Sequence, residues 1–457
     1  MTRLAALSLV LFVVVTACGA GSGSASSPSR VGGTPIQSPP ISTEWTEYHR
    51  DGARSGQGPS DPPLTSPSVA WKASVDGDVY ASPLIVGGHV FVATEDNTVY
   101  ALDLFTGSTI WKTHLGTPVD AASLPCGDIG PITGITGTPA IDAAAGRLYV
   151  VAYLRTRHHM LFSLDLVDGS IRSQQDVDPS GSTPAVEQQR GALAIASGYV
   201  YVPLGGLYGD CGQYHGYLVA VPLAGGAAFA YRVPAAAGAG LWSAMGPTVA
   251  ANGDVYVVSG NATSGSGFAY SNSVIELSPT LRVKSYFAPS NWASLDASDT
   301  DLGSVGATLL PQLGLVVAVG KDGIAYVLRA GRLGGIGGQV ASRKVCAGAW
   351  GGTAWLGSMV FVPCRDGLAA LSVGPASVRL AWSDARPAMA SPIVAAGAVW
   401  AVDAYSATLY AINPASGAVL YSTRLAHTKH FSSLAATEGF VIAPAGDEIE
   451  AILTLGS

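Results

Sequence analysis

The sequence predicts an all-β protein of repeated units closed into a ring, an eight-bladed β-propeller. Of its 457 residues, 57 are glycine, 48% are hydrophobic and only 12% are charged. That composition provides a large core and many tight turns, as expected of an all-β chain. The second observation is an internal repeat: a small-residue turn, an apolar run, a turn, a second run, a turn of the form D/N-x-x-x-G and a third run. Periodicity of this kind indicates blades or solenoid turns.

Three copies of the repeat are clear, and weaker copies fill the gaps between them. The clear copies carry their D/N-x-x-x-G turns at Asp103 to Gly107, Asp165 to Gly169 and Asn413 to Gly417. We expect eight blades, at residues 79–115, 135–175, 185–234, 244–288, 303–344, 349–383, 388–425 and 429–455. Because the third and fifth of these are irregular, a seven-bladed ring is the main alternative.

The last copy lacks an outer strand, and the start of the chain offers one. The run at residues 68–75 precedes the first blade and has the pattern of an outer strand. Pairing it into the final blade would close the ring and leave no long free edge. We therefore expect the N-terminal strand to complete the eighth blade.

The first residues have the pattern of a targeting segment. Arg3 is followed by an apolar stretch at residues 4–15, which is too short to span a bilayer, since a span needs about 20 residues. The stretch ends in Val15-Thr16-Ala17-Cys18, which resembles the lipobox of bacterial lipoproteins, where the cysteine is lipidated and becomes the mature N-terminus. An ordinary secretory signal cleaved near Ala17 is the alternative.

These features divide the chain into three parts. We expect residues 1–18 to be a lipoprotein signal peptide with Cys18 as the lipidation site, and residues 19–43, rich in Gly, Ser and Pro, to be a disordered tether. Residues 44–457 would form the propeller. The sequence therefore predicts an exported protein at the cell surface, anchored by lipid to the extracytoplasmic face of the bacterial cell membrane.

Four cysteines remain in the body of the chain, and an exported protein would pair them as two disulfides. Three pairings are open, and we expect Cys126–Cys211 and Cys346–Cys364. The first would join two glycine-rich loops of adjacent blades, and the second would close a short local loop. A metal site built from these cysteines is a poor alternative, because no C-x-x-C is present.

The charge and the motif content exclude several classes of function. A net charge of −7 argues against a nucleic-acid partner, which favours a basic face. The chain carries no G-x-S-x-G, H-E-x-x-H or P-loop motif. The pair His158-His159 could bind a metal, but a loop pair of this kind is more often simply solvated.

The segment from Ala101 to Trp111 reads A-x-D-x-x-T-G-x-x-x-W. It looks like the tryptophan-docking motif of pyrroloquinoline-quinone (PQQ) type β-propellers, in which the Trp packs between neighbouring blades. Over residues 45–455 the chain resembles quinoprotein alcohol dehydrogenases and, more loosely, polyvinyl-alcohol dehydrogenase-like proteins. The segment from Trp45 to Gly56 resembles the W-x-x-x-x-x-D-x-x-R-x-G lead-in of many PQQ-repeat proteins, and we expect it to pack as an arm on one face.

In those enzymes PQQ lies on the ring axis, stacked on a Trp and bound to Ca²⁺, and the resemblance implies where such a site would be. Trp242 matches the Trp on which the quinone stacks, and Asn261 matches a calcium ligand. Asp301 matches the general base that takes the alcohol proton, and Lys321 matches the residue that faces the quinone. PQQ and calcium are therefore the cofactors that the resemblance implies.

Two departures weaken this resemblance. The family's calcium-binding Glu lies in a glycine-rich turn, where this chain has Asp210, which is shorter and displaced. The family's adjacent pair of cysteines over the quinone is missing, since Cys126 is followed by Gly127. If Cys126 bonds to Cys211, a disulfide would also cross the region where cofactor and metal should meet.

Two functions from different classes are therefore open. The favoured one is a non-catalytic binding or scaffold propeller that presents a face and a central funnel to an extracytoplasmic protein, a polysaccharide or a small ligand. The alternative is a PQQ- and Ca²⁺-dependent alcohol dehydrogenase, a quinoprotein with a partly retained site. Since the chain has no C-x-x-C-H haem motif, such an enzyme would pass its electrons to another molecule.

Overall fold

The structure is a computed structural model that describes residues 44–59, 62–263, 267–386 and 389–455. The predicted signal peptide, the lipidated Cys18 and the tether lie outside these residues. The described chain is almost entirely β, with one short α-helix, α1 (Trp292–Ala297), and three 3-10 helices, η1 (Ala121–Ser123), η2 (Leu302–Ser304) and η3 (Pro311–Leu313). No helix in this part of the chain combines the length and the apolar character needed to cross a membrane.

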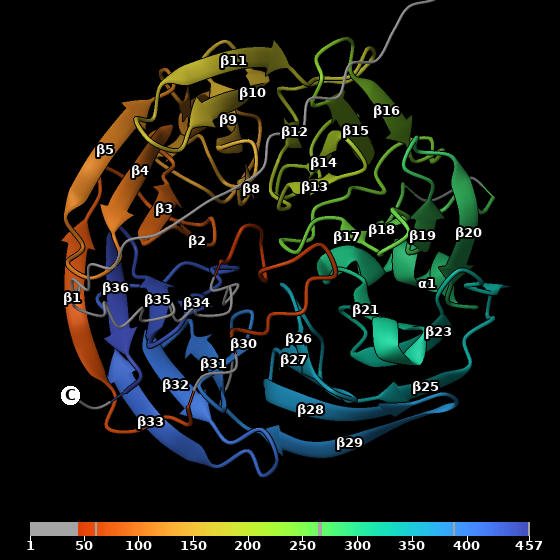
Figure 1. Cartoon of the computed structure of the whole chain (residues 1–457). Helices are drawn as coiled ribbons and strands as arrows, with labels where there is room; N and C mark the ends of the chain where they lie inside the picture. The colour runs from red at the N-terminus through yellow and green to blue at the C-terminus, as the bar shows by residue number, and fades with distance from the viewer. Residues whose placement is uncertain (1–43, 60–61, 264–266, 387–388, 456–457) are drawn as a thin grey trace, which may run out of the picture. The chain divides into compact units, whose positions relative to one another are not determined.

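Eight sheets follow one another around an axis, which confirms the eight-bladed β-propeller (Figure 1). The first strand of each sheet lies near the axis and the last lies on the rim. From inside to outside, blades 1 to 8 consist of β2 (Leu84–Val86), β3 (His89–Ala93), β4 (Thr98–Asp103), β5 (Thr109–His114); β8 (Ala140–Asp142), β9 (Arg147–Leu154), β10 (His158–Asp165), β11 (Ile171–Asp176); β13 (Ala194–Ala196), β14 (Tyr199–Gly206), β15 (Tyr217–Pro222), β16 (Phe229–Arg232); β17 (Thr248–Val249), β18 (Val255–Val258), β19 (Val274–Leu277), β20 (Val283–Ala288); β21 (Thr308–Leu310), β22 (Leu315–Val319), β23 (Ile324–Arg329), β25 (Ala341–Lys344); β26 (Ala354–Leu356), β27 (Met359–Cys364), β28 (Gly367–Gly374), β29 (Ser377–Asp384); β30 (Ile393–Ala395), β31 (Ala398–Asp403), β32 (Thr408–Ile412), β33 (Val419–Arg424); and β34 (Ala435–Thr437), β35 (Phe440–Pro444), β36 (Glu448–Leu453), β1 (Ser68–Ser74).

Blade 8 is closed by the start of the chain, as the sequence predicts. β1 pairs antiparallel with β36, from Ser68 opposite Leu453 to Ser74 opposite Glu448. Because the first and last strands share one sheet, the ring has no open seam.

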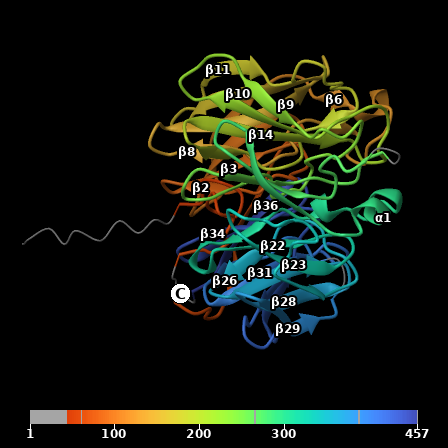
Figure 2. The same cartoon turned by 90° about the vertical axis from the view of Figure 1, so that its right-hand side faces the viewer.

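Blades 3 and 5 depart from the regular pattern, as their sequences indicate. In blade 3 an extra strand, β12 (Glu187–Gln188), pairs with β14. In blade 5 the chain between β23 and β25 leaves its sheet and supplies β24 (Gly335–Ile336), which pairs in parallel with β20 of blade 4. A further hairpin, β6 (Val119–Asp120) with β7 (Ile132–Thr133), stands between blades 1 and 2. In the side view, β6 and α1 project from the same face of the ring (Figure 2).

Tryptophan side chains join three pairs of neighbouring blades by a hydrogen bond and by packing. The indole N–H of Trp111 on β5 donates to the carbonyl of Leu166 in blade 2 at 3.1 Å. Its ring occupies the space beside Gly169, where a Cβ would lie 2.4 Å from the indole. The D/N-x-x-x-G turn therefore ends in glycine because the indole of the preceding blade fills the place of a side chain. The same contact recurs for Trp71 on Leu104 and Gly107, and for Trp382 on Pro414 and Gly417.

Residues 44–59, the arm, lie across the centre of the ring and contact its innermost strands (Figure 1). The innermost strand of each blade presents an edge toward the axis, and an edge needs hydrogen-bond partners. The arm supplies them to six of the eight blades, which donate one backbone N–H each, from Ile85, Ile141, Ile195, Val249, Trp355 and Val394. These backbone partners explain why the arm follows the axis.

A buried ion pair fixes the arm in place. Arg54 Nη1 lies 2.9 Å from Glu47 Oε2, and the Arg54 side chain is fully buried. The same guanidinium donates to the carbonyl oxygens of Pro247 and Leu193, which precede the innermost strands of blades 4 and 3. Burial raises the pKa of Glu47, and the Arg54 guanidinium opposes that shift. Arg54 thus joins the arm to two blades at once.

Replacing Arg54 with Met is expected to lower the free energy of unfolding by about 3–5 kcal/mol, because it leaves the Glu47 carboxylate buried without its cation. Urea-induced unfolding measures this loss. The matched control is Arg172→Met, which breaks an ion pair to Asp165 in which the arginine is 47% exposed. That change should cost about 0–1 kcal/mol. Equal losses in the two variants would contradict the anchoring role of Arg54.

Glu95 is a buried carboxyl at the junction of blades 1 and 2. Its Oε2 accepts the backbone N–H of Gly134 at 2.6 Å. Burial raises the pKa of Glu95 to about 7, although the bond from Gly134 opposes the shift. Glu95 therefore holds a proton in the folded protein over a pH range in which it is ionised in the unfolded chain.

Because the folded state binds this proton more tightly, the contribution of Glu95 to stability should fall as pH rises from about 4.5 to about 7. The loss approaches about 3 kcal/mol above that window. Glu95→Gln removes the titration, so the variant should gain stability relative to the wild type between pH 5 and pH 8 in urea unfolding. Glu438→Gln, at an exposed position, is the control. A stability difference for Glu95→Gln that is the same at both pH values would refute this assignment.

Candidate functional site

A cavity of about 910 Å³ opens at the centre of the ring. Its lining comes from the loops that join one blade to the next and from the turns between the second and third strands, so several blades share it. Five aromatic side chains take part, namely Tyr208, Trp242, Trp350, Tyr405 and Phe431.

The arm lies beneath this cavity. Tyr48 lines a small recess together with Arg190, Ala244 and Phe431, and these last three residues also line the main cavity. The Tyr48 side chain is fully buried. Because the arm occupies the channel at this depth, the cavity is a funnel with one mouth.

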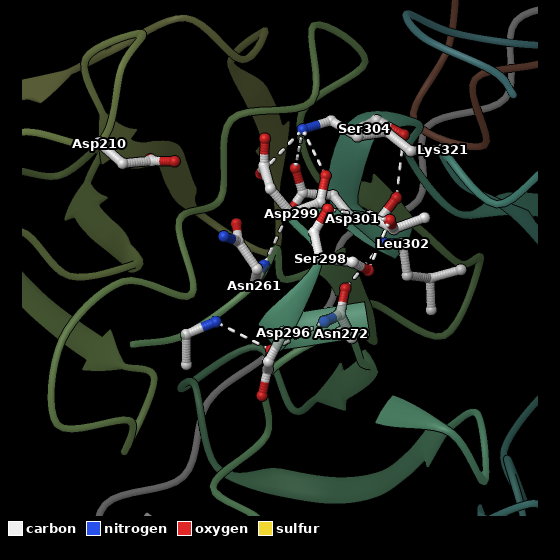
Figure 3. Close-up of polar contacts among 12 residues, drawn as sticks. Asp210, Asn261, Asn272, Asp296, Ser298, Asp299, Asp301, Leu302, Ser304 and Lys321 are labelled. Carbon is white, nitrogen blue, oxygen red and sulfur yellow. Dashed lines mark hydrogen bonds and ion pairs between the residues drawn. The ribbon is translucent and has the colours of Figure 1, made fainter. Parts of the chain in front are cut away.

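Asp301 and Lys321 meet on one wall of the cavity (Figure 3). Asp301 directly precedes η2, and Lys321 lies in the turn between β22 and β23. Lys321 Nζ lies 2.6 Å from Asp301 Oδ2 and 3.1 Å from Asp299 Oδ1. Burial opposes the charge on Lys321, but the two carboxylates outweigh it and raise its pKa. Burial raises the pKa of Asp301, and the Lys321 ammonium counters that effect.

Trp242 lies against glycines. A Cβ on Gly240 or on Gly260 would come within 2.2 Å of the indole, so neither position accepts a side chain. A Cβ on Gly260 would also come 2.8 Å from Asp301 Oδ1. These glycines place Trp242 and Asp301 close together and leave the indole lining the cavity, where an aromatic face can stack on a ligand.

Asn261 joins the same cluster through its backbone. Its N–H donates to Asp301 Oδ1 at 2.6 Å. Its side-chain Oδ1 is buried and has no hydrogen-bond partner among the described residues. The neighbouring Asp296 carboxylate is already held, since it accepts from the Ala262 N–H and from the Asn272 side chain (Figure 3). Asn261 Oδ1 is thus a buried acceptor that this part of the chain leaves unused.

Asp210 lies apart from this cluster (Figure 3). Its carboxylate accepts the Tyr214 hydroxyl at 2.5 Å, within its own loop. The next residue, Cys211, forms the predicted disulfide with Cys126. The structure therefore brings Asn261, Asp301, Lys321 and Trp242 together but not Asp210.

Both predicted disulfides are confirmed. Cys126 bonds to Cys211 and ties the β6–β7 connection to the loop between β14 and β15. Cys346 bonds to Cys364 and ties the loop between blades 5 and 6 to the end of β27. Cys364 lines the cavity, and so do Gly209 and Asp210 next to Cys211, so both bonds lie in or beside its wall.

The cavity has a second charged wall, which the sequence did not predict. Asp128 Oδ2 lies 3.2 Å from His430 Nε2, and Asp128 Oδ1 lies 3.8 Å from Arg190 Nη2. The Arg190 guanidinium also stands over the Phe431 ring, 5.4 Å from its centroid. Burial opposes ionisation of Asp128, but His430 and Arg190 outweigh it and lower its pKa. The charged residues come from three separate loops, and no local pattern in the sequence connects them.

The family profile that matches this chain is described as outer membrane protein assembly factor BamB, and the match covers residues 65–273. The match spans less than half of the chain, and over that stretch the propeller is similar to this family of PQQ-type repeats. No curated protein sequence matches it significantly.

Solved structures show the same propeller in proteins of different function. The quinohemoprotein alcohol dehydrogenase of Comamonas testosteroni has 15% identity and a TM-score of 0.73, over 91% of this chain and 81% of that one. A europium-containing methanol dehydrogenase has 14% identity and a TM-score of 0.70, over 90% of this chain and 98% of that one. BamB of Moraxella catarrhalis has 13% identity and a TM-score of 0.59, over 85% of this chain and 99% of that one. At these identities the likeness establishes the fold alone.

The oxygen atoms around Asn261 fall short of a calcium cage. Ca²⁺ takes about six to eight oxygen ligands. Asn261 Oδ1 is available, but Asp301 Oδ1 and Oδ2 already accept from Asn261 and Lys321, and Asp210 lies elsewhere. The described residues around Asn261 therefore supply only part of a calcium shell. The cofactor and catalytic roles of Trp242, Asn261, Asp301, Lys321 and Asp210 stay predictions.

The losses of unfolding free energy caused by replacing Asp301 and by replacing Lys321 should be strongly coupled. Lys321→Met leaves the Asp301 carboxylate buried without its main cation and is expected to cost about 3–5 kcal/mol of unfolding free energy. Asp301→Asn should cost less, because Lys321 keeps Asp299 as a partner. The double variant should therefore be more stable than the sum of the two single losses predicts, by about 0.5–3 kcal/mol. Urea unfolding of the four proteins measures the coupling, and strictly additive losses would disprove it.

Proposed function

We propose that this chain is a non-catalytic binding propeller whose central cavity receives its ligand. The observation that carries the proposal is the cavity itself, about 910 Å³ in volume. That value lies within the roughly 300–1,000 Å³ of pockets that enclose small ligands. Aromatic rings and a few convergent polar groups line it, which is the usual composition of a binding site.

Export and lipid anchoring belong to the same proposal. They rest on the lipobox-like Val15-Thr16-Ala17-Cys18 at the end of a short apolar stretch. Anchored through Cys18, the tether at residues 19–43 would hold the ring away from the extracytoplasmic face of the membrane. An extracytoplasmic protein, a polysaccharide or a small ligand could reach it there. The match to a family described as an assembly factor supports a partner-binding or scaffold role for the outer surface as well.

The Asp301 wall favours binding over alcohol oxidation. A general base takes a proton on a carboxylate oxygen, and a neighbouring ammonium lowers the proton affinity of that oxygen. Asp301 Oδ2 is held by the Lys321 ammonium at 2.6 Å, and Oδ1 by the Asn261 N–H at 2.6 Å. The incomplete set of calcium ligands around Asn261 supports the same conclusion.

The alternative is a PQQ- and Ca²⁺-dependent alcohol dehydrogenase. The observation that favours it is Asn261 Oδ1, a buried oxygen without a partner among the described residues, next to Trp242 and Asp301. In that function Trp242 would be the stacking floor, Asp301 the base and Lys321 the group that faces the quinone. Two of the similar solved structures are dehydrogenases by name.

Adding PQQ and Ca²⁺ to the full chain is expected to leave its melting temperature and the quinone absorbance unchanged, because a ligand raises stability only when the folded state binds it. Primary alcohols with a dye acceptor should give no turnover. Trp242→Ala and Asn261→Ala are the matched variants. A calcium-dependent rise in melting temperature that both variants abolish, together with reduction of the dye, would overturn the binding proposal and establish the dehydrogenase.

A further inference from the structure

The central cavity, which the proposed function takes as the binding site, presents aromatic rings with open faces. Tyr208 is 63% exposed and Tyr405 is 80% exposed, and both line the cavity, from loops of blades 3 and 7. Trp242 and Trp350 line it as well and are partly buried. A tyrosine ring combines an apolar face with a polar tip. Such rings suit a ligand that is apolar on its faces and polar at its edge.

The first wall pairs one cation with two carboxylates, which leaves a single net negative charge. Lys321 Nζ lies 2.6 Å from Asp301 and 3.1 Å from Asp299. Asp301 is buried, whereas the Asp299 side chain is 62% exposed. An anionic ligand would therefore meet a cation whose partners are already in place, and a cationic ligand would have to compete with Lys321 for them.

The second wall repeats this arrangement with the signs exchanged. One carboxylate, Asp128, lies between two cationic or protonatable groups, His430 at 3.2 Å and Arg190 at 3.8 Å. Asp210, which accepts from the Tyr214 hydroxyl, and the exposed Arg365 also line the cavity, and neither forms an ion pair within the described residues. Apart from His430, the cavity lining carries four carboxylates and three permanent cations, so hydrogen-bond donors and acceptors lie side by side with a net charge of only about −1.

Both disulfides brace these walls. The Cys346–Cys364 bond ties the loop between blades 5 and 6 to the end of β27, and Cys364 lines the cavity. The Cys126–Cys211 bond holds the loop that carries Tyr208. A site fixed before binding loses little conformational entropy when the ligand arrives. Such preorganisation matters most for a ligand that is well solvated and gains little from each contact.

These features select the ligand by its chemistry. A hydroxyl group donates one hydrogen bond and accepts two, so it can bridge a cation and a carboxylate without separating them. A molecule with many hydroxyls and no net charge can bridge the paired charges. If it also has apolar C–H faces, it can stack on the open rings. We infer that the central cavity binds a neutral carbohydrate, with Tyr208 and Tyr405 as its stacking rings. A funnel of about 910 Å³ with one mouth accommodates a short oligosaccharide or the end of a polysaccharide chain.

Calorimetric titration of the full chain with maltotriose, cellotriose and mannotriose tests this inference, with trigalacturonate as the charged counterpart. At least one of the neutral trisaccharides should bind more tightly than trigalacturonate. Tyr208→Ala and Tyr405→Ala should each weaken that binding about tenfold, because each removes a stacking ring. Their melting temperatures should change little, since both rings are largely exposed. Phe105→Ala, at a ring that is 66% exposed outside the central cavity, is the matched control and should bind as the wild type does.

Three results would overturn the inference. The first is that none of the three neutral trisaccharides binds. The second is that trigalacturonate binds more tightly than the neutral probes, which would leave the proposed binding function intact. The third is binding of a neutral probe that Tyr208→Ala and Tyr405→Ala both leave unchanged, because the site would then lie elsewhere. The proposed function fails by a different result, calcium-dependent binding of PQQ with dye reduction.

Discussion

The hydrogen bonding of the innermost strands is the constraint on which this ring depends. Each of these strands turns an edge to the axis, and a buried N–H without a partner costs about 1–3 kcal/mol. The arm at residues 44–59 accepts such an N–H from six of the eight blades, and the buried Glu47–Arg54 pair holds it there. The next strand in the sequence, β1, closes blade 8. One N-terminal segment therefore fills the centre of the ring and completes its rim.

The position of the arm decides where chemistry can occur. With Tyr48 buried beneath the cavity, the central channel is open toward one face only. On that face the loops are long enough to carry aromatic and charged side chains, and two disulfides limit their motion. The blades behind them act as a rigid support, which is the usual division of labour between scaffold and loops. A preformed funnel of this kind favours recognition of a ligand that enters whole or by one end.

The fold was predictable because its repeating contact involves side chains. A Trp such as Trp111 requires a glycine such as Gly169 in the next blade, and that pair leaves a readable spacing in the sequence. Two disulfides were predictable because four cysteines remain in the body of the chain, but three pairings were open and the cysteine count alone did not choose among them. The course of the arm was not predictable, because its partners are backbone N–H groups, which every residue except proline supplies. The wall of Asp128, Arg190 and His430 was not predictable either, because only the closed ring brings its three loops together.

The sequence predicted each member of one cluster separately: Trp242, Asn261, Asp301 and Lys321. The presence of this cluster does not identify a cofactor. Asp301 accepts from the Asn261 N–H and pairs with Lys321, and Gly260 seats Trp242 against both, so each contact supports the local fold. A ring of this type can keep all of them for stability alone. Asn261 Oδ1 is the atom that this account leaves unexplained. A buried acceptor without a partner costs about 1–3 kcal/mol, and an apolar side chain of similar size would avoid that cost. The buried oxygen therefore indicates a partner from outside the chain, either an ordered water molecule or the ligand itself.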